Sequence, residues 1–146
     1  MIQPIVLHPD PILKEACVKI PKQEELWDLR RDLWDTLCHH GGYGLSAPQI
    51  GRSCRAFIYN GIFCVDPVIS KFWSDISVEE EGCLSIPGTI VKVGRPTWIK
   101  ANYTTLTGQL IDCKLTGLDA RVFQHELDHL NGILILDRVK ANGWIC

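Results

Sequence analysis

Long hydrophobic runs are missing from this chain of 146 residues, because every apolar stretch breaks off well before the roughly 20 residues that cross a bilayer. The first residues, Met1–Ile5, also lack the basic-then-apolar layout of a secretory signal. Runs of Lys or Arg are absent too, and the net charge is only −2 at pH 7. We therefore expect neither membrane insertion nor nucleic-acid binding.

Closely spaced cysteines are also missing, because the cysteines stand singly and none belongs to a C-x-x-C motif. They are Cys17, Cys38, Cys54, Cys64, Cys83, Cys113 and Cys146. An odd, scattered set argues against a secreted disulfide framework and for a reducing compartment such as the cytoplasm. We expect most of these thiols to pack as small buried hydrophobes.

The helical patterns are clear in two places. The first helix is predicted over residues 23–38, where acidic residues begin the segment and glycines follow it. The second is predicted to start at Thr116, which resembles a capping box with Asp119, and to end before Gly132. The residues expected on the buried face of the first helix are Leu26, Leu29, Leu33, Trp34 and Leu37.

Between these helices the pattern is that of strands joined by short turns. Asn60-Gly61 is a strong hairpin signal between two apolar segments. The predicted strands are 54–59, 62–65, 90–93, 97–104 and 109–115. Strands that cluster rather than alternate with helices indicate an α+β fold, with antiparallel strands packed around a central second helix. The length fits one compact domain spanning residues 1–146.

The second helix carries the tract Gln124–His129, the strongest chemical signal in the chain. His125 and His129 stand four residues apart, so they project from one face of a helix and can hold one metal ion. Glu126 lies beside such an ion without needing to ligate it, where it can move protons. The pattern indicates a metallohydrolase but does not say which one.

Two further segments contain groups suited to the same chemistry. Cys83, in Glu81–Gly88, is a candidate third ligand because thiolate is a good donor for Zn²⁺ or Fe²⁺. Three protein ligands would leave a tetrahedral position open for water. Gln49, in the glycine-rich segment Gly42–Gly51, offers an amide donor of the kind that stabilises an oxyanion. Taken alone, the cysteine would be interpreted as structural and the glutamine as an ordinary exposed residue of a surface loop.

Together the three segments resemble the peptide deformylase family, in its form with a short C-terminus. That family has a glycine-rich loop ending in A-A-P-Q, a central E-G-C-L-S and a helical Q-H-E-x-D-H. This chain has Gly42–Gln49, Glu81–Ser85 and Gln124–His129 in that order, and residues 7–13 are similar to the family's N-terminal L-x-x-P-D-x-x-L. Motifs occurring jointly and in order are far more specific than H-E-x-x-H alone.

The resemblance implies a hydrolase of protein biosynthesis that removes the formyl group from the N-terminal formyl-methionine of nascent polypeptides. One divalent metal ion per chain would be held by Cys83, His125 and His129. The family uses Fe²⁺ physiologically and also works with Ni²⁺, Co²⁺ or, more poorly, Zn²⁺. Metal-bound hydroxide would attack the formyl carbonyl with Glu126 as the general base, since a divalent ion can lower the pKa of water from 15.7 to about 7.

The resemblance also implies roles away from the metal. The Gln49 side chain and the Leu84 backbone N–H would hold the developing oxyanion, and Gly44 would hydrogen-bond the substrate backbone. Glu81 would pair with Arg95. The candidate walls of an apolar pocket for the methionine side chain are Tyr43, Leu118 and Val122, although core packing explains the last two as well. The partners would be N-formyl-methionyl peptides and nascent chains near the ribosome.

The chain departs from the family pattern at a few positions. Ser46 replaces the first alanine of A-A-P-Q and adds a hydroxyl near the site. Tyr43 and Glu79 stand where aliphatic residues are common, and Ile90 stands where many members have an arginine that contacts the substrate chain. The short tail after the second helix fits a bacterial, organellar or viral origin equally well.

Two other interpretations of the metal motif compete. A zincin-like endopeptidase would share H-E-x-x-H, but such proteases usually place the third ligand downstream, where this chain offers only Asp137 as a carboxylate. A structural zinc module would close the site with a fourth cysteine. Glu126 and Gln49 count against the module, because a closed site needs neither a base nor an oxyanion donor.

Overall fold

The computed structural model describes the backbone of residues 1–142 and the side chains of residues 1–139; Cys146 lies outside the described residues. The helices are α1 (Leu26–His40), α2 (Gly117–Leu130) and α3 (Ile135–Asn142), with 3-10 turns at Pro11–Lys14, Gln23–Glu25 and Ala47–Ile50. The strands are β1 (Gly44–Ser46), β2 (Ala56–Tyr59), β3 (Ile62–Phe72), β4 (Ile76–Cys83), β5 (Ile86–Pro96), β6 (Trp98–Thr104) and β7 (Leu110–Thr116).

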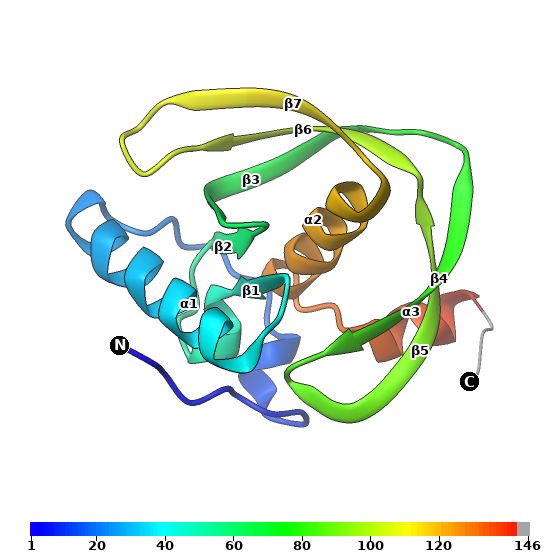
Figure 1. Cartoon of the computed structure of the whole chain (residues 1–146), viewed down its shortest axis with the longest axis horizontal. Helices are drawn as coiled ribbons and strands as arrows, with labels where there is room; N and C mark the ends of the chain where they lie inside the picture. Colours follow the sequence, from blue (N-terminus) through cyan, green and yellow to red (C-terminus); the bar gives the residue numbers. More distant parts are fainter. Residues whose placement is uncertain (143–146) are drawn as a thin grey trace.

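The strands form two antiparallel sheets with α2 between them. The larger sheet has the order β1-β2-β3-β6-β7, and β4 pairs with β5 in a separate hairpin. Figure 1 shows α2 crossing the centre of the molecule, with α1 near β1 and with α3 beside the β4–β5 hairpin. The fold is therefore α+β with antiparallel strands around a central helix, as the sequence predicts.

The apolar core is divided among the elements that surround α2. Phe123 of α2 packs edge-on against Phe57 and Tyr59 of β2, with ring centroids 5.0 and 5.4 Å apart. A second cluster joins the leucines of α1 to β1 and β2, and a third joins α3 to β5. Because α2 is packed from several sides, its pocket-facing residues are held in fixed positions.

The first predicted helix is confirmed with small changes at its ends. Residues 23–25 form a 3-10 turn, and α1 runs on to His40, where Gly41 ends it with a left-handed φ of 73°. The four leucines of the predicted face are buried, but the expectation for Trp34 is wrong, since Trp34 is 41% exposed. Trp34 stands about 100° around the helix from Leu33, at the edge of the apolar stripe.

The predicted Asn60-Gly61 hairpin is confirmed. Tyr59 of β2 faces Ile62 of β3, and Asn60 and Gly61 take positive φ values of 47° and 74°. The strands predicted at 97–104 and 109–115 are β6 and β7, and the short one at 90–93 is part of the longer β5. The sequence does not predict the 3-10 turn at 47–50 or strands β1 and β4. In β4, three consecutive glutamates break the alternation of apolar and polar residues that marks a strand.

The second predicted helix is confirmed, but its capping box is not. Thr116 is the N-cap residue without a side-chain capping hydrogen bond. Asp119 instead accepts hydrogen bonds from Tyr43 Oη at 2.9 Å and Asn60 Nδ2 at 3.4 Å. Gly132 follows the helix end with a φ of 71°, as expected. None of the helices in the described part of the chain is long and apolar enough to cross a membrane.

Candidate metal centre and its pocket

The three predicted metal ligands meet at one point of the fold. Cys83 ends β4, and His125 and His129 lie one turn apart on α2. One donor atom from each residue lies within 4.8 Å of the other two, and Cys83 Sγ is 3.4 Å from His129 Nε2. Metal–ligand bonds of about 2.0–2.3 Å at tetrahedral angles place donor atoms roughly 3.5 Å apart. The donor set therefore fits one divalent ion.

Glu81 orients the first of these histidines from the neighbouring strand β4. Its Oε1 lies 2.9 Å from His125 Nδ1, so Nε2 is the ring nitrogen that can face a metal. Burial opposes a positive charge on His125, but its hydrogen bonds with Cys83 and Glu81 raise its pKa to about 10. A metal ion at Nε2 would therefore take the place of a proton.

The Glu81 carboxylate is itself held by two arginines. Arg95 Nε and Nη2 donate to it at 2.6 and 2.9 Å, and Arg121 Nη1 donates at 2.6 Å. Burial opposes ionisation of Glu81, but the hydrogen bonds from His125 and Arg95 hold its pKa well below the usual range. The pairing of Glu81 with Arg95, implied by the family resemblance, is thus present in the structure.

The same arginine links this cluster to the C-terminal helix. Arg95 Nη1 donates to Asp128 Oδ2 at 2.9 Å, and Asp128 also accepts two hydrogen bonds from Arg138 of α3. Arg95 is only 3% exposed, so its charge is neutralised by the two carboxylates rather than by water. One continuous ion-pair network therefore runs from α3 to the metal-facing His125.

Glu126 lies in the same pocket with one oxygen unsatisfied. The residue is 3% exposed, and its Oε1 has no hydrogen-bond partner among the described residues. Burial raises its pKa to about 7. A methyl group added to Gly44 would lie 2.6 Å from Glu126 Oε2, so only glycine allows β1 to approach this carboxylate. An orphaned carboxylate oxygen beside a metal-binding set is suited to accept a proton from water.

Gln49 is fixed with its amide nitrogen toward the centre. Ser46 donates to Gln49 Oε1 twice, from its backbone N at 3.0 Å and from its Oγ at 3.1 Å. The amide Nε2 therefore points the other way, 3.5 Å from Cys83 Sγ and 3.1 Å from Ser85 Oγ. The serine that departs from the family pattern thus orients the predicted oxyanion donor.

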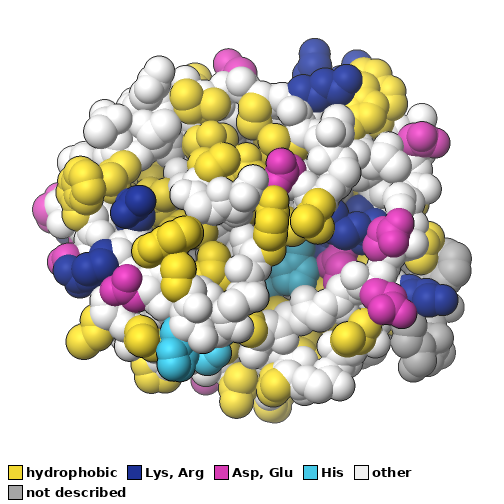
Figure 2. All heavy atoms as spheres, in the orientation of Figure 1, with side chains coloured by type: hydrophobic (Ala, Val, Ile, Leu, Met, Phe, Trp, Pro, Cys, Tyr) yellow, Lys and Arg dark blue, Asp and Glu magenta, His cyan; other side chains and the backbone are white. Residues whose placement is uncertain are grey.

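The pocket between β1 and the β4–β5 hairpin has a volume of about 560 Å³. All of the predicted catalytic and substrate-binding residues line it, namely Tyr43, Gly44, Gln49, Leu84, Leu118, Val122 and Glu126. Leu84 and Ser85 form the turn between β4 and β5, where Cys83 faces Ile86. Figure 2 shows a histidine side chain inside a hollow, with hydrophobic side chains on one side and charged ones on the other.

The proposed walls differ in burial. Leu118 is 58% exposed and Tyr43 is 39% exposed, so both lie at the mouth, whereas Val122 packs partly into the core. Ile90 also lines the pocket and is 60% exposed. Glu79 lines a second, adjacent cavity rather than this pocket. The carboxylate of Glu79 therefore does not replace an aliphatic wall of the main pocket.

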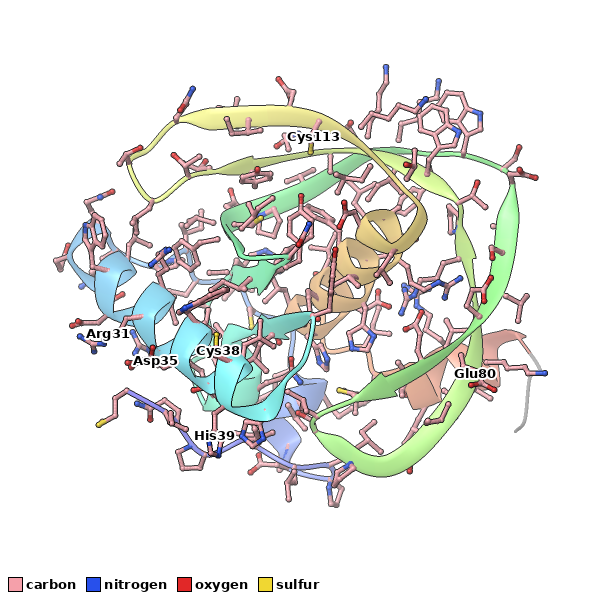
Figure 3. All side chains as sticks on the ribbon, in the orientation of Figure 1. Arg31, Asp35, Cys38, His39, Glu80 and Cys113 are labelled. Atoms are coloured by element: carbon pink, nitrogen blue, oxygen red, sulfur yellow. The ribbon has the colours of Figure 1, made fainter. Side chains whose placement is uncertain are left out.

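Other groups at the centre had only weak sequence signals. Arg121 lies four residues before His125, so helical spacing alone places it on the same face. Asp128 and Arg138 join the network through Arg95, which is distant in sequence, and no local pattern indicates that link. Cys38 and His39 lie on α1, away from Glu80 of β4 in Figure 3, and neither of them lines the pocket.

This geometry does not favour either the zincin-like endopeptidase or the structural zinc module. Among the described residues the metal-binding group contains Cys83, His125 and His129 and no fourth cysteine, which a closed zinc module would need. The third ligand comes from upstream of α2, whereas a zincin-like protease usually takes it from downstream. The cysteines in the described part of the chain are free.

Comparison with known proteins identifies the fold. The polypeptide deformylase family model matches residues 2–143. The chain is 41% identical over 148 residues to the chloroplastic peptide deformylase 1B of rice, covering 94% of this chain and 55% of that protein. The peptide deformylase of Thermotoga maritima superposes with a TM-score of 0.91 at 38% identity, covering 94% of this chain and 97% of that one.

A class I type b peptide deformylase from Acinetobacter baumannii, solved with Met-Ala-Ser bound, is also similar. It superposes with a TM-score of 0.89 at 32% identity, and the match covers 94% of this chain and 98% of that one. The similarity therefore extends over the sheets, the central helix and the pocket rather than over the metal motif alone.

Proposed function

The chain belongs to the polypeptide deformylase family of hydrolases, which remove the N-formyl group from nascent peptides, and we propose how its own residues perform that reaction. The observation that carries the proposal is the meeting of Cys83, His125, Glu126 and Gln49 in one pocket. We take residues 1–146 as a single catalytic domain whose substrates are N-formyl-methionyl peptides.

The substrate backbone is proposed to lie along β1. This strand is at the edge of the larger sheet, so within residues 1–142 the far side of Gly44 has no strand neighbour. Gly44 can therefore hydrogen-bond an extended peptide, and its missing side chain lets that peptide approach Glu126. The methionine side chain would lie against Leu118 and Val122, with Tyr43 at the mouth.

The formyl carbonyl oxygen is proposed to face Gln49 Nε2 and the backbone N–H of Leu84. Both groups line the pocket, and Ser46 holds the amide in the donating orientation. Each such donor stabilises the negative charge that develops on this oxygen, and removing one costs roughly 3–4 kcal/mol of transition-state stabilisation.

Proton transfer is assigned to Glu126. Its unpartnered oxygen would accept a proton from the attacking water, and the same carboxyl group would deliver it to the leaving amine nitrogen. The C–O bond forms first and puts the negative charge on the former carbonyl oxygen. When the C=O bond re-forms, the C–N bond breaks, and formate and a free α-amine are released. A divalent ion bound by Cys83, His125 and His129 would supply the Lewis acidity that lowers the pKa of that water.

We propose Fe²⁺ as the physiological metal, with Zn²⁺, Ni²⁺ or Co²⁺ able to replace it. One thiolate and two imidazoles suit each of these ions. Nascent chains near the ribosome are the proposed source of the substrate, and a reducing compartment, cytoplasmic or organellar, suits the free cysteines.

The test is formate release from formyl-Met-Ala-Ser by protein loaded anaerobically with Fe²⁺, compared with Zn²⁺-loaded and chelator-treated protein. We expect the rate of formate release to be highest with Fe²⁺, lower with Zn²⁺ and lowest for the chelator-treated apoprotein. Absence of formate with every metal would refute the activity, and cleavage of an unformylated peptide would revive the endopeptidase interpretation.

A further inference from the structure

A second cavity of about 420 Å³ adjoins the reaction pocket. It is lined by segments that also support the metal centre, including Ser77 and Glu79 of β4 and Thr97 between β5 and β6. Nothing in the proposed reaction uses this space.

Three residues line both cavities, namely Glu80, Leu118 and Arg121. Glu80 and Leu118 are exposed and so lie at the rim. Only 12% of the Arg121 side chain is exposed, which places it in the interior of the boundary. Arg121 is therefore the partition between the two spaces.

The Arg121 side chain is anchored across that boundary. It leaves α2 and donates to Glu81 Oε2 at 2.6 Å, to Val93 O at 3.0 Å and to Ser77 O at 2.8 Å. These acceptors belong to β4 and β5, so the guanidinium spans from the helix to the hairpin. Two of the three acceptors belong to buried residues, Glu81 and Val93, and the third belongs to half-buried Ser77. An arginine held by three such hydrogen bonds does not swing aside at low cost.

Arg121 also lies among the residues assigned to the methionine pocket. On α2 it follows Leu118 by three residues and precedes His125 by four, so all three share one helix face. We propose that Arg121 determines specificity by closing the side-chain pocket, and so sets the length of the first side chain that the enzyme accepts. This inference rests on the proposed function.

The test compares formyl-Met-Ala-Ser with a peptide in which 2-aminooctanoate, two heavy atoms longer, replaces methionine. In the wild-type protein, kcat/KM for the longer substrate should be at least tenfold lower. Arg121→Ala should raise kcat/KM for the longer substrate, relative to that for the methionine substrate, about 15-fold, because each of the two newly buried methylenes contributes roughly fourfold.

Arg121→Met is the matched control, because it removes the ion pair with Glu81 but keeps a side chain of similar length. In Arg121→Met, the ratio of kcat/KM for the longer substrate to that for the methionine substrate should stay within threefold of the wild-type ratio, even if both kcat/KM values fall. Equal shifts in the two variants, or no shift in Arg121→Ala, would overturn the proposal. Metal content measured in each protein separates these results from loss of the site.

If Arg121→Ala does not fold, comparison of the two peptides with the wild-type protein still tests whether the pocket limits side-chain length. Equal turnover of both peptides would show that no partition limits the pocket, which overturns the inference while leaving deformylation intact. Absence of formate from the methionine peptide would instead refute the proposed function.

Discussion

The two walls of the reaction pocket are held in place by different kinds of interaction. The β1 wall, with the 3-10 turn that follows it, is positioned by backbone contacts and neutral hydrogen bonds, and every residue from Leu45 to Ile50 is buried. The opposite wall, made by β4, β5 and α2, is held by buried ion pairs around Glu81 and Arg95. The first wall is therefore sensitive to shape and the second to charge.

The largest effect is expected on the shape-sensitive wall. Gly44→Ala places a methyl group 2.6 Å from Glu126 Oε2 and 2.9 Å from Val122 Cγ1, so either β1 or the carboxylate must move. We expect kcat/KM for formyl-Met-Ala-Ser to fall about a thousandfold with metal content unchanged, since small displacements of catalytic groups are costly.

The matched change on the other wall is Gly82→Ala, where the nearest atom to the added methyl is 3.8 Å away. Its kcat/KM should fall less than tenfold. Equal losses in the two alanine variants would remove the distinction between the walls.

The next effect tests the charge-sensitive wall. Glu81→Gln keeps the shape but leaves Arg95 and Arg121 without their shared anion and weakens the hold on His125 Nδ1. We expect metal affinity, measured by chelator competition, to weaken 10–100-fold. The free energy of unfolding of the apoprotein, from urea titration, should fall by about 3–5 kcal/mol. Unchanged metal affinity would show that Glu81 does not orient the ligand.

A smaller effect is expected where Ser46 orients Gln49. Ser46→Ala removes the Oγ hydrogen bond and leaves the backbone N–H bond to Gln49 Oε1. Loss of one neutral hydrogen bond, about 1 kcal/mol, corresponds to roughly a fivefold fall in kcat with KM little changed. A rise in KM instead would place Ser46 in substrate binding rather than in orientation of the amide.

The smallest effect is expected at the outer end of the ion-pair network. Arg138 is 39% exposed, so its pair with Asp128 is partly screened by water. Arg138→Ala should lower the free energy of unfolding by about 1 kcal/mol in urea titration and change kcat/KM less than threefold. A larger loss of activity would mean that α3 controls the metal centre directly.

The sequence predicts the reactive residues of this site better than the contacts that hold those residues in place. His125, Glu126 and His129 follow from helical spacing, and Cys83 and Gln49 follow once the ordered motifs are read together. The Asn60-Gly61 turn and helices α1 and α2 are also predicted, because each depends on local residues. These features are encoded within a few residues of one another.

The supporting contacts are not encoded locally. The local sequence predicts that Asp119 caps α2, but its carboxylate accepts hydrogen bonds from Tyr43 and Asn60 instead. Those donors approach Asp119 only after β1 and α2 pack together. The sequence does not indicate strand β4 because it contains three glutamates. Only Glu81 among them is buried, where arginines from β5 and α2 pair with it. Trp34 is exposed because its helix face extends past the core. Long-range packing decides each of these cases.

The most direct measurement of the central claim is single-turnover formate release by Glu126→Gln beside Glu126→Ala and the wild-type enzyme, with metal content determined for each. The glutamine keeps the volume beside Gly44 but cannot accept the proton. We expect metal binding to persist in both variants and formate release to fall by a factor of about 10²–10⁴. Formate release within tenfold of wild type in metal-loaded Glu126→Gln would contradict the assignment of Glu126 as the general base.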